Sequence, residues 1–162
     1  MTFKNLEHMG VAQHTLNSLM NKDMPQYKSI QKTITFDGGT TNGIGDESGT
    51  NNPYTLFTVT GLVELSIIAV CSTDLVGTSA TVEIGTATNT AGLIAQTTAT
   101  DLDEDEIWHD ATPNSSVELT SVVTRKLVYE NVILTVGTAD VTAGVVTFIV
   151  RWAPISEDGN VA

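Results

Sequence analysis

The densest group of residues that could do chemistry is the acidic run at 101–106, which reads Asp-Leu-Asp-Glu-Asp-Glu. Asp101, Asp103 and Asp105 have the one-three-five spacing of a calcium-binding EF-hand loop. That motif also needs a glycine at position six and a glutamate at position twelve, where this chain has Glu106 and Thr112. The run is therefore interpreted as a solvated acidic loop, with a divalent site of another kind and an acidic patch facing a partner as the alternatives.

Nucleophiles and general bases do not form a recognisable set in this sequence. Cys71 is the only cysteine and ends an apolar stretch, which is typical of a small buried hydrophobic residue rather than a reactive thiol. His8 and His14 are six residues apart, and His109 is interpreted as a surface or strand-end histidine. No serine occupies a nucleophile-elbow pattern. We therefore expect no catalytic residues, no cofactor and no required metal.

The two tryptophans are the residues best suited to a carbohydrate platform, because sugars stack on exposed indole rings. Trp152, however, lies in phase with Val146, Phe148 and Val150, which favours packing in a core. Exposed rings at Trp108 and Trp152 would thus favour a sugar-binding module, whereas buried rings would indicate that both residues serve the core.

Charge divides the chain into two parts. Residues 1–32 carry a net charge of +2 and residues 33–162 a net charge of −14, which together give the formal net charge of −12. Phosphate backbones and anionic membranes need a basic surface, so nucleic acid and membrane surfaces are disfavoured as partners. No apolar run approaches the roughly 20 residues that span a bilayer, and no signal peptide is recognised at residues 1–20.

The larger part has the period of two that is typical of half-buried strands. Residues 62–71 place Val63, Leu65, Ile67, Ala69 and Cys71 on one face. Similar alternation occurs at 79–84, 132–136 and 145–152, with a strand at 33–36 and weaker candidates at 54–60, 92–98 and 117–128. Turns are expected at 130–131 and at 140–144, where Gly144 can take a positive φ. The fold class is therefore all-β, a jelly-roll-like, immunoglobulin-like or related β-sandwich. The sequence leaves the strand order open.

The smaller part, 1–32, is expected to be an N-terminal arm with a helix over residues 3–20, beside a β-sandwich body at 33–162. The body opens with a long Gly/Asn/Asp-rich loop at 37–53, which is expected to be functional or poorly ordered. A lone helix of this length is marginal in water, so the arm is expected to pack on a partner surface. Its candidate contact residues are the following: Phe3, Lys4, Leu6, Met9, Leu16, Leu19, Lys22 and Lys28.

Several stretches of the body resemble small structural proteins of tailed bacteriophages and prophages. The likeness covers residues 54–154 and is carried by 75–85 (LVGTSATVEIG), 91–101 (AGLIAQTTATD), 106–113 (EIWHDATP), 135–144 (TVGTADVTAG) and 151–154 (RWAP). Within that group, the proteins with an assigned role are capsid decoration (cement) proteins. Residues 1–32 lie outside the likeness.

The resemblance implies a jelly-roll or related sandwich, a homotrimer, and binding to the major capsid protein on the outside of the virion. It implies synthesis in the bacterial host cytoplasm and no enzymatic activity. A head-fibre or tail-associated module that binds a receptor or carbohydrate is the alternative.

Overall fold

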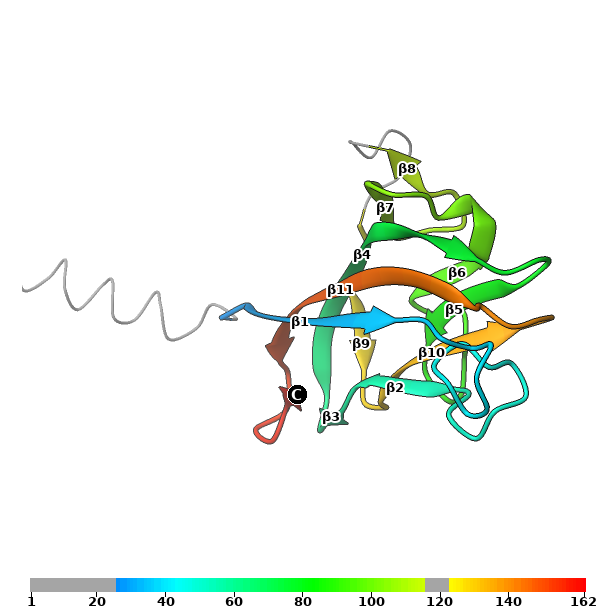
Figure 1. Ribbon diagram of the computed structural model, residues 1–162. Coiled ribbons are helices and arrows are strands. Elements are labelled where there is room, and N and C mark those ends of the chain that lie inside the picture. Colours follow the sequence, from blue (N-terminus) through cyan, green and yellow to red (C-terminus); the bar gives the residue numbers. More distant parts are fainter. Residues whose placement is uncertain (1–25, 116–122) are drawn as a thin grey trace, which may run out of the picture.

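The computed structural model describes residues 26–115 and 123–162, which form two antiparallel β-sheets packed face to face (Figure 1). The all-β sandwich expected from the alternating sequence is confirmed. The expected helix over residues 3–20 lies outside the described residues. Within the described part of the chain, the only helical element is a short 3-10 turn, η1 (Ala99–Asp101), and no helix is long and apolar enough to cross a membrane.

The larger sheet has six strands in the order β1-β11-β4-β7-β8, with β9 pairing the other half of β4. Its members are β1 (Lys28–Thr35), β4 (Val63–Val76), β7 (Glu106–Trp108), β8 (Asn114–Ser115), β9 (Lys126–Val128) and β11 (Ala143–Pro154). The smaller sheet has the order β2-β10-β5-β6, made of β2 (Tyr54–Phe57), β5 (Thr81–Gly85), β6 (Ile94–Thr98) and β10 (Val132–Gly137). A two-stranded ribbon joins β3 (Val59–Thr60) to β12 (Asn160–Val161).

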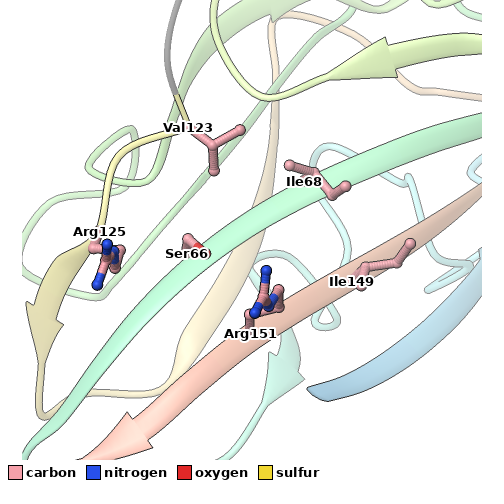
Figure 2. A pocket seen from close by; sticks show the side chains of 6 residues that line it. All are labelled: Ser66, Ile68, Val123, Arg125, Ile149 and Arg151. Carbon is pink, nitrogen blue, oxygen red and sulfur yellow. The ribbon is translucent and has the colours of Figure 1, made fainter. Parts of the chain in front are cut away.

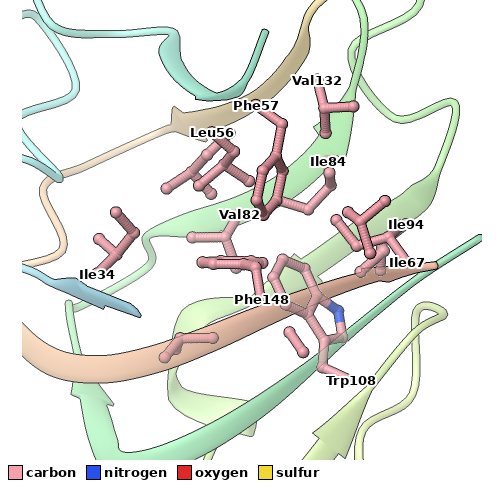
Figure 3. Packing of buried hydrophobic residues seen from close by; sticks show 14 of the residues in the cluster. Ile34, Leu56, Phe57, Ile67, Val82, Ile84, Ile94, Trp108, Val132 and Phe148 are labelled. Carbon is pink, nitrogen blue, oxygen red and sulfur yellow. The ribbon is translucent and has the colours of Figure 1, made fainter. Parts of the chain in front are cut away.

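One apolar core fills the space between the two sheets (Figure 3). The face predicted for β4 is the buried one: Val63, Leu65, Ala69 and Cys71 have no exposed area and Ile67 is 4% exposed. The alternation predicted for β11 is also confirmed, since every second residue from Val146 to Trp152 is buried. Trp108 packs edge-on against Phe148, with ring centroids 6.3 Å apart, near the centre of this core.

Strand β1 begins earlier than the sequence indicated. The division at residue 32 assigned Lys28 to the arm, whereas β1 runs from Lys28 and pairs with β11 along its whole length. The reason is that Lys28 and Lys32 stand on the core side of an edge strand, where their long side chains reach aromatic rings. The Lys28 Nζ lies 4.6 Å from the centroid of the Trp152 ring, and the Lys32 Nζ lies 4.7 Å from that of Tyr54. These lysines occupy core-side positions with their stems while keeping their charge at the edge.

Lys32 also ties the two sheets together at that edge, because its Nζ donates a hydrogen bond of 3.2 Å to the carbonyl of Thr55 in β2. Because lysines occupy two core-side positions, the first half of β1 lacks the apolar alternation of a strand, which is why the sequence pattern assigns it to the arm.

The long loop at 37–53 is held by its own polar side chains. The Asp37 carboxylate accepts from the backbone N–H of Ile44 at 2.6 Å, and the Asp46 carboxylate accepts from that of Asn42 at 2.9 Å. The Asn52 side chain continues the sheet beyond β2, since it donates to the Val136 carbonyl at 2.7 Å and accepts from the Val136 N–H at 3.0 Å. Of the two expectations for this loop, poor order is wrong. Its functional role stays a prediction.

The predicted turns do not close hairpins, because each of them connects strands of different sheets. Residues 130–131 lead from β9 in the larger sheet to β10 in the smaller one, and residues 138–142 lead from β10 back to β11. Gly144 has the predicted positive φ, 123°, but it lies within β11, where the pairing with β4 shifts register between Ala143 and Val145. The chain thus crosses between the two layers repeatedly.

Candidate interaction surface

Seven of the eight candidate contact residues lie outside the described residues, namely Phe3, Lys4, Leu6, Met9, Leu16, Leu19 and Lys22. The eighth, Lys28, is an exposed residue at the start of β1 and is engaged with Trp152 of the same chain. A role for the first seven in docking stays a prediction, and Lys28 belongs to the sandwich.

The point where the N-terminal segment joins the sandwich is fixed by three polar side chains. The Tyr27 hydroxyl donates a hydrogen bond of 2.6 Å to the Glu64 carboxylate. Arg125 donates to the same hydroxyl at 2.6 Å and to Glu64 at 3.2 Å, and its guanidinium lies 5.4 Å from the centroid of the Tyr27 ring. The hydrogen bond from Tyr27, together with the charge of Arg125, lowers the pKa of Glu64, although partial burial opposes the shift.

Beside this cluster, the outward face of the larger sheet is hollowed into a groove of about 290 Å³ (Figure 2). Ser66 and Ile68 of β4, Ile149 and Arg151 of β11, and Val123 and Arg125 before β9 line it. In Figure 2, Arg125 and Arg151 lie on either side of Ser66, with Ile68 and Ile149 beyond it. A smaller hollow of about 140 Å³ shares Ser66 and both arginines and extends to Tyr27.

This groove differs from an ordinary solvated sheet face. Ile68 and Ile149 are half-buried, and Val123 is 41% exposed, although all three point away from the core. Arg125 and Arg151 are the only arginines in the chain, and both lie in the groove. Branched apolar residues flanked by guanidinium groups are typical of surfaces that contact another protein, where arginine is enriched and lysine is depleted.

The residues considered for chemistry do not converge into a site. Asp101, Asp103, Glu104 and Asp105 are exposed in the connection between β6 and β7. The backbone N–H of Glu104 is bound by the Asp74 carboxylate at 2.7 Å. Across residues 26–115 and 123–162, no group of three or more His, Cys, Asp and Glu side chains is placed to hold a metal ion. The interpretation of this run as a solvated loop agrees with its exposure.

Cys71 and His109 are both buried. Burial raises the pKa of the Cys71 thiol, which donates to the carbonyl of Thr73 at 3.1 Å, so the prediction of a structural cysteine is confirmed. Of the two positions predicted for His109, the strand end is confirmed, because the residue directly follows β7, whereas the surface position is wrong, because the residue is only 9% exposed. It follows Trp108, whose indole N–H donates to Thr97 at 2.9 Å, and this buried bond draws the segment inward.

Both tryptophans belong to the core, Trp108 with 1% and Trp152 with 3% of its surface exposed. The aromatic residue most open to solvent among the described residues is Tyr129, at 72%. It borders a hollow of about 180 Å³ between the 86–89 turn and the 127–130 segment. The Glu130 carboxylate fixes that turn by accepting from the Thr88 hydroxyl at 2.5 Å and the Thr88 N–H at 3.0 Å, which lowers the Glu130 pKa.

The sequence indicated two members of the groove on one strand, because the alternation at 145–152 placed Ile149 and Arg151 on the face opposite Phe148. The alternation at 62–71 likewise placed Ser66 on the face opposite Leu65. The sequence did not indicate Ser66, Ile68, Val123 or Arg125 as neighbours of Ile149. The available signal was the matching outward phase of 64–70 and 147–151, which would have required the pairing of β4 with β11 to be known.

A comparison with protein-family models, with curated proteins and with solved structures finds no match to this chain.

Proposed function

We propose that this protein is a structural component of a bacteriophage virion, which binds the outside of the capsid lattice and stabilises it as a decoration or cement protein. Two lines of reasoning support the proposal. The first is the resemblance of residues 54–154 to structural proteins of tailed phages. The second is the physical character of the molecule, namely its strand order and its outward-facing groove.

The strand order supports a jelly roll as the finer description of the fold. Eight strands form the series β1, β2, β4, β5, β6, β7, β10 and β11. The antiparallel pairs β1–β11, β2–β10, β4–β7 and β5–β6 join the first of these eight strands to the last, the second to the next to last, and so on inward. Such nested pairs arise when one long antiparallel ribbon is wrapped around a core, and the wrapped ribbon gives the sheets β1-β11-β4-β7 and β2-β10-β5-β6. Jelly rolls occur in viral capsid proteins but also in lectins and cupins, so the fold alone does not decide the function.

The observation that carries the functional proposal is the groove on the larger sheet. A sheet face that only meets water is usually polar, as this face is at Ser29, Thr33 and Thr147. The groove instead offers Ile68, Ile149 and Val123 to a protein partner, next to two arginines. In the proposed mechanism, the protein buries area against capsid subunits that are weakly joined, and a homotrimer makes three such contacts at once, which raises the overall affinity through effective concentration.

The experiment that tests the function is co-sedimentation of the purified protein with expanded, empty capsids of the phage that encodes it. We expect saturable binding and a higher temperature of capsid disruption. Light scattering of the free protein, and imaging of the decorated capsid, test the trimer. Absence of binding at micromolar concentrations would reject the decoration role, and isolated copies away from any symmetry axis would reject the trimer.

The second candidate is a receptor- or carbohydrate-binding module on a fibre or tail, and one observation favours it. Tyr129 is strongly exposed beside the polar residues Thr86, Thr88 and Asn89, which is the kind of ring that a sugar could stack on. The burial of Trp108 and Trp152 counts against it. Binding of the protein to host-surface glycans that is lost in Tyr129→Ala, without any binding to capsids, would favour this candidate over decoration.

A further inference from the structure

The groove on the outward face leads directly to the point where the N-terminal segment leaves the sandwich. The larger hollow holds Ile68, Ile149 and Val123, and the smaller one continues from it past Ser66 to Tyr27. Together they form one channel across β4 and β11, apolar at one end and bordered by guanidinium groups at the other. A hollow of this size fits a single chain segment with a few apolar side chains better than it fits the flat surface of another protein.

The two arginines of this channel differ in what they bind. Arg125 is committed to Glu64 and Tyr27. Arg151 is exposed and makes no ion pair or hydrogen bond with any residue in the described ranges. The described sandwich is otherwise rich in carboxylates, so a guanidinium without a partner stands out on its surface. Because a guanidinium binds carboxylates and its neighbours in the groove are apolar, the groove fits a segment that carries both apolar side chains and a carboxylate.

We propose that this groove receives the N-terminal segment, residues 1–25, of a second copy of this chain. That segment has apolar residues at mostly three- and four-residue spacings, with Glu7 between Leu6 and Met9, and Asp23 near its end. The contact goes beyond the proposed function, because it joins copies of the chain and needs no capsid. The groove is then filled by the neighbouring copy, and the linked copies contact the capsid through other parts of their surface.

The register of the larger sheet favours a second copy over the segment of the same chain. β1 pairs Ser29 with Arg151 and Gln31 with Ile149, so the groove extends from Tyr27 in the direction in which β1 runs. Residues 1–25 are joined to the chain before Tyr27, at the beginning of the strand and not at the end toward which the groove extends. To enter its own groove, the segment would have to turn back over the Tyr27 side chain, which is held by Glu64 and Arg125.

Reach does not limit an exchange between copies. Twenty-five residues span about 37 Å as a helix and at most roughly 85 Å when extended. When each copy gives its segment to the next, the contact is heterologous, and a heterologous contact closes into a ring if the rotation between copies permits. A ring of three linked in this way would act as a single clamp on the capsid.

The test uses the full chain with the single substitution Ser29→Cys, labelled with a benzophenone maleimide. Ser29 is exposed at the groove rim opposite Arg151, whereas the native Cys71 is buried and escapes labelling. After irradiation in the absence of capsids, we expect a product of twice the chain mass on a denaturing gel. Peptide mapping should join residue 29 to tryptic peptides within residues 1–22. The matched control, Gln96→Cys, is exposed on β6 of the other sheet and should not capture these peptides.

A product of single mass that joins residue 29 to the same peptides would place the segment in its own groove and overturn the proposal. Capture of other peptides, or of none, would overturn it as well. In the labelled protein, Arg151→Glu should lower the yield of the doubled product about two- to five-fold, and Arg151→Lys should largely keep it. An unchanged yield in Arg151→Glu would remove the role of Arg151. Because no capsid is present, these outcomes are independent of whether the protein decorates one.

Discussion

The two faces of the larger sheet are built from the same two long strands, yet they do different things. On the inner face of β4 and β11, every alternate residue from Val63 to Cys71 and from Val146 to Trp152 is buried in the common core. On the outer face, Ile68 and Ile149 are half-buried and stand beside Ser66 and Arg151. Apolar residues on the inner face are explained by folding, whereas those on the outer face gain little from it. The difference shows that an isoleucine in such a strand indicates a contact with a partner only when its side chain lies on the outward face.

The largest expected effect comes from extending this comparison to β1. Deleting residues 1–32 removes Lys28 to Lys32 and uncovers the β11 edge, so we expect the melting temperature to fall by more than about 10 °C or folding to fail. Deleting residues 1–25 leaves β1 intact and should preserve the cooperative transition. Circular dichroism melting of both proteins checks this. If the 1–32 deletion melts like the full chain, β1 contributes less than its pairing indicates.

The 1–25 deletion also tests the arm. It should keep the β signal while binding to capsids becomes much weaker, because the exchanged segment no longer links the copies. A pull-down with capsids measures this effect. Full binding by the shortened protein would remove the docking role expected for Phe3, Leu6, Met9, Leu16 and Leu19.

Neighbouring residues on opposite faces give the sharpest test of the comparison. Phe148→Ala leaves a cavity beside Trp108 and should cost about 3–5 kcal/mol of unfolding free energy. Ile149→Ala changes the outer face and should cost about 1 kcal/mol or less at protein concentrations too low for copies to associate. Urea denaturation of both variants measures the two values. Equal losses would mean that Ile149 is part of the folding core.

A smaller effect is expected from the Tyr27–Glu64–Arg125 cluster at the border of the groove. The folded state lowers the Glu64 pKa, so the stability that Glu64 contributes is complete above the unfolded value of roughly 4.3 and is lost as pH falls through the lower folded value. Tyr27→Phe removes the hydrogen bond that is the main cause. The melting temperatures of wild type and variant, measured from pH 2.5 to 7, should therefore differ at neutral pH and converge in acid. A difference that is constant with pH would contradict this assignment.

Removal of metal ions is expected to have no effect on stability, because the acidic run at 101–106 belongs to neither face of β4 and β11. Chelation with EDTA should leave the melting temperature unchanged, because Glu106 and Thr112 stand where a calcium loop of this spacing needs its glycine and its glutamate. Differential scanning fluorimetry with EDTA and with added calcium makes the measurement. A rise of several degrees with calcium would reveal a site that stabilises the native state.

The sequence by itself determined the class of this protein and the inner side of its longest strands. Alternation with a period of two is a local property, so Val63 to Cys71 and Val146 to Trp152 could be placed on one face each without knowledge of their neighbours. The same local rule placed Cys71 on the buried face, and the composition of the turn at 140–144 predicted a positive φ at Gly144. Local patterns failed for Lys28, because a charged residue at an edge can bury its stem against Trp152. They also failed for the exposure of His109, although not for its place at a strand end, because the buried bond of Trp108 to Thr97 draws the next residue inward.

Only the tertiary structure decided the strand order and the groove. The nested pairs, with β1 against β11 and β2 against β10, join segments more than 70 residues apart, and nothing local in either partner specifies the other. The turns at 130–131 and 140–144 are compatible with hairpins, but their strands enter opposite sheets because burying both inner faces requires two layers. Arg125 and Arg151, 26 positions apart, meet across β4 only through that packing. The candidate contact surface is for this reason a product of the assembled sheet, and no single segment of the sequence contains it.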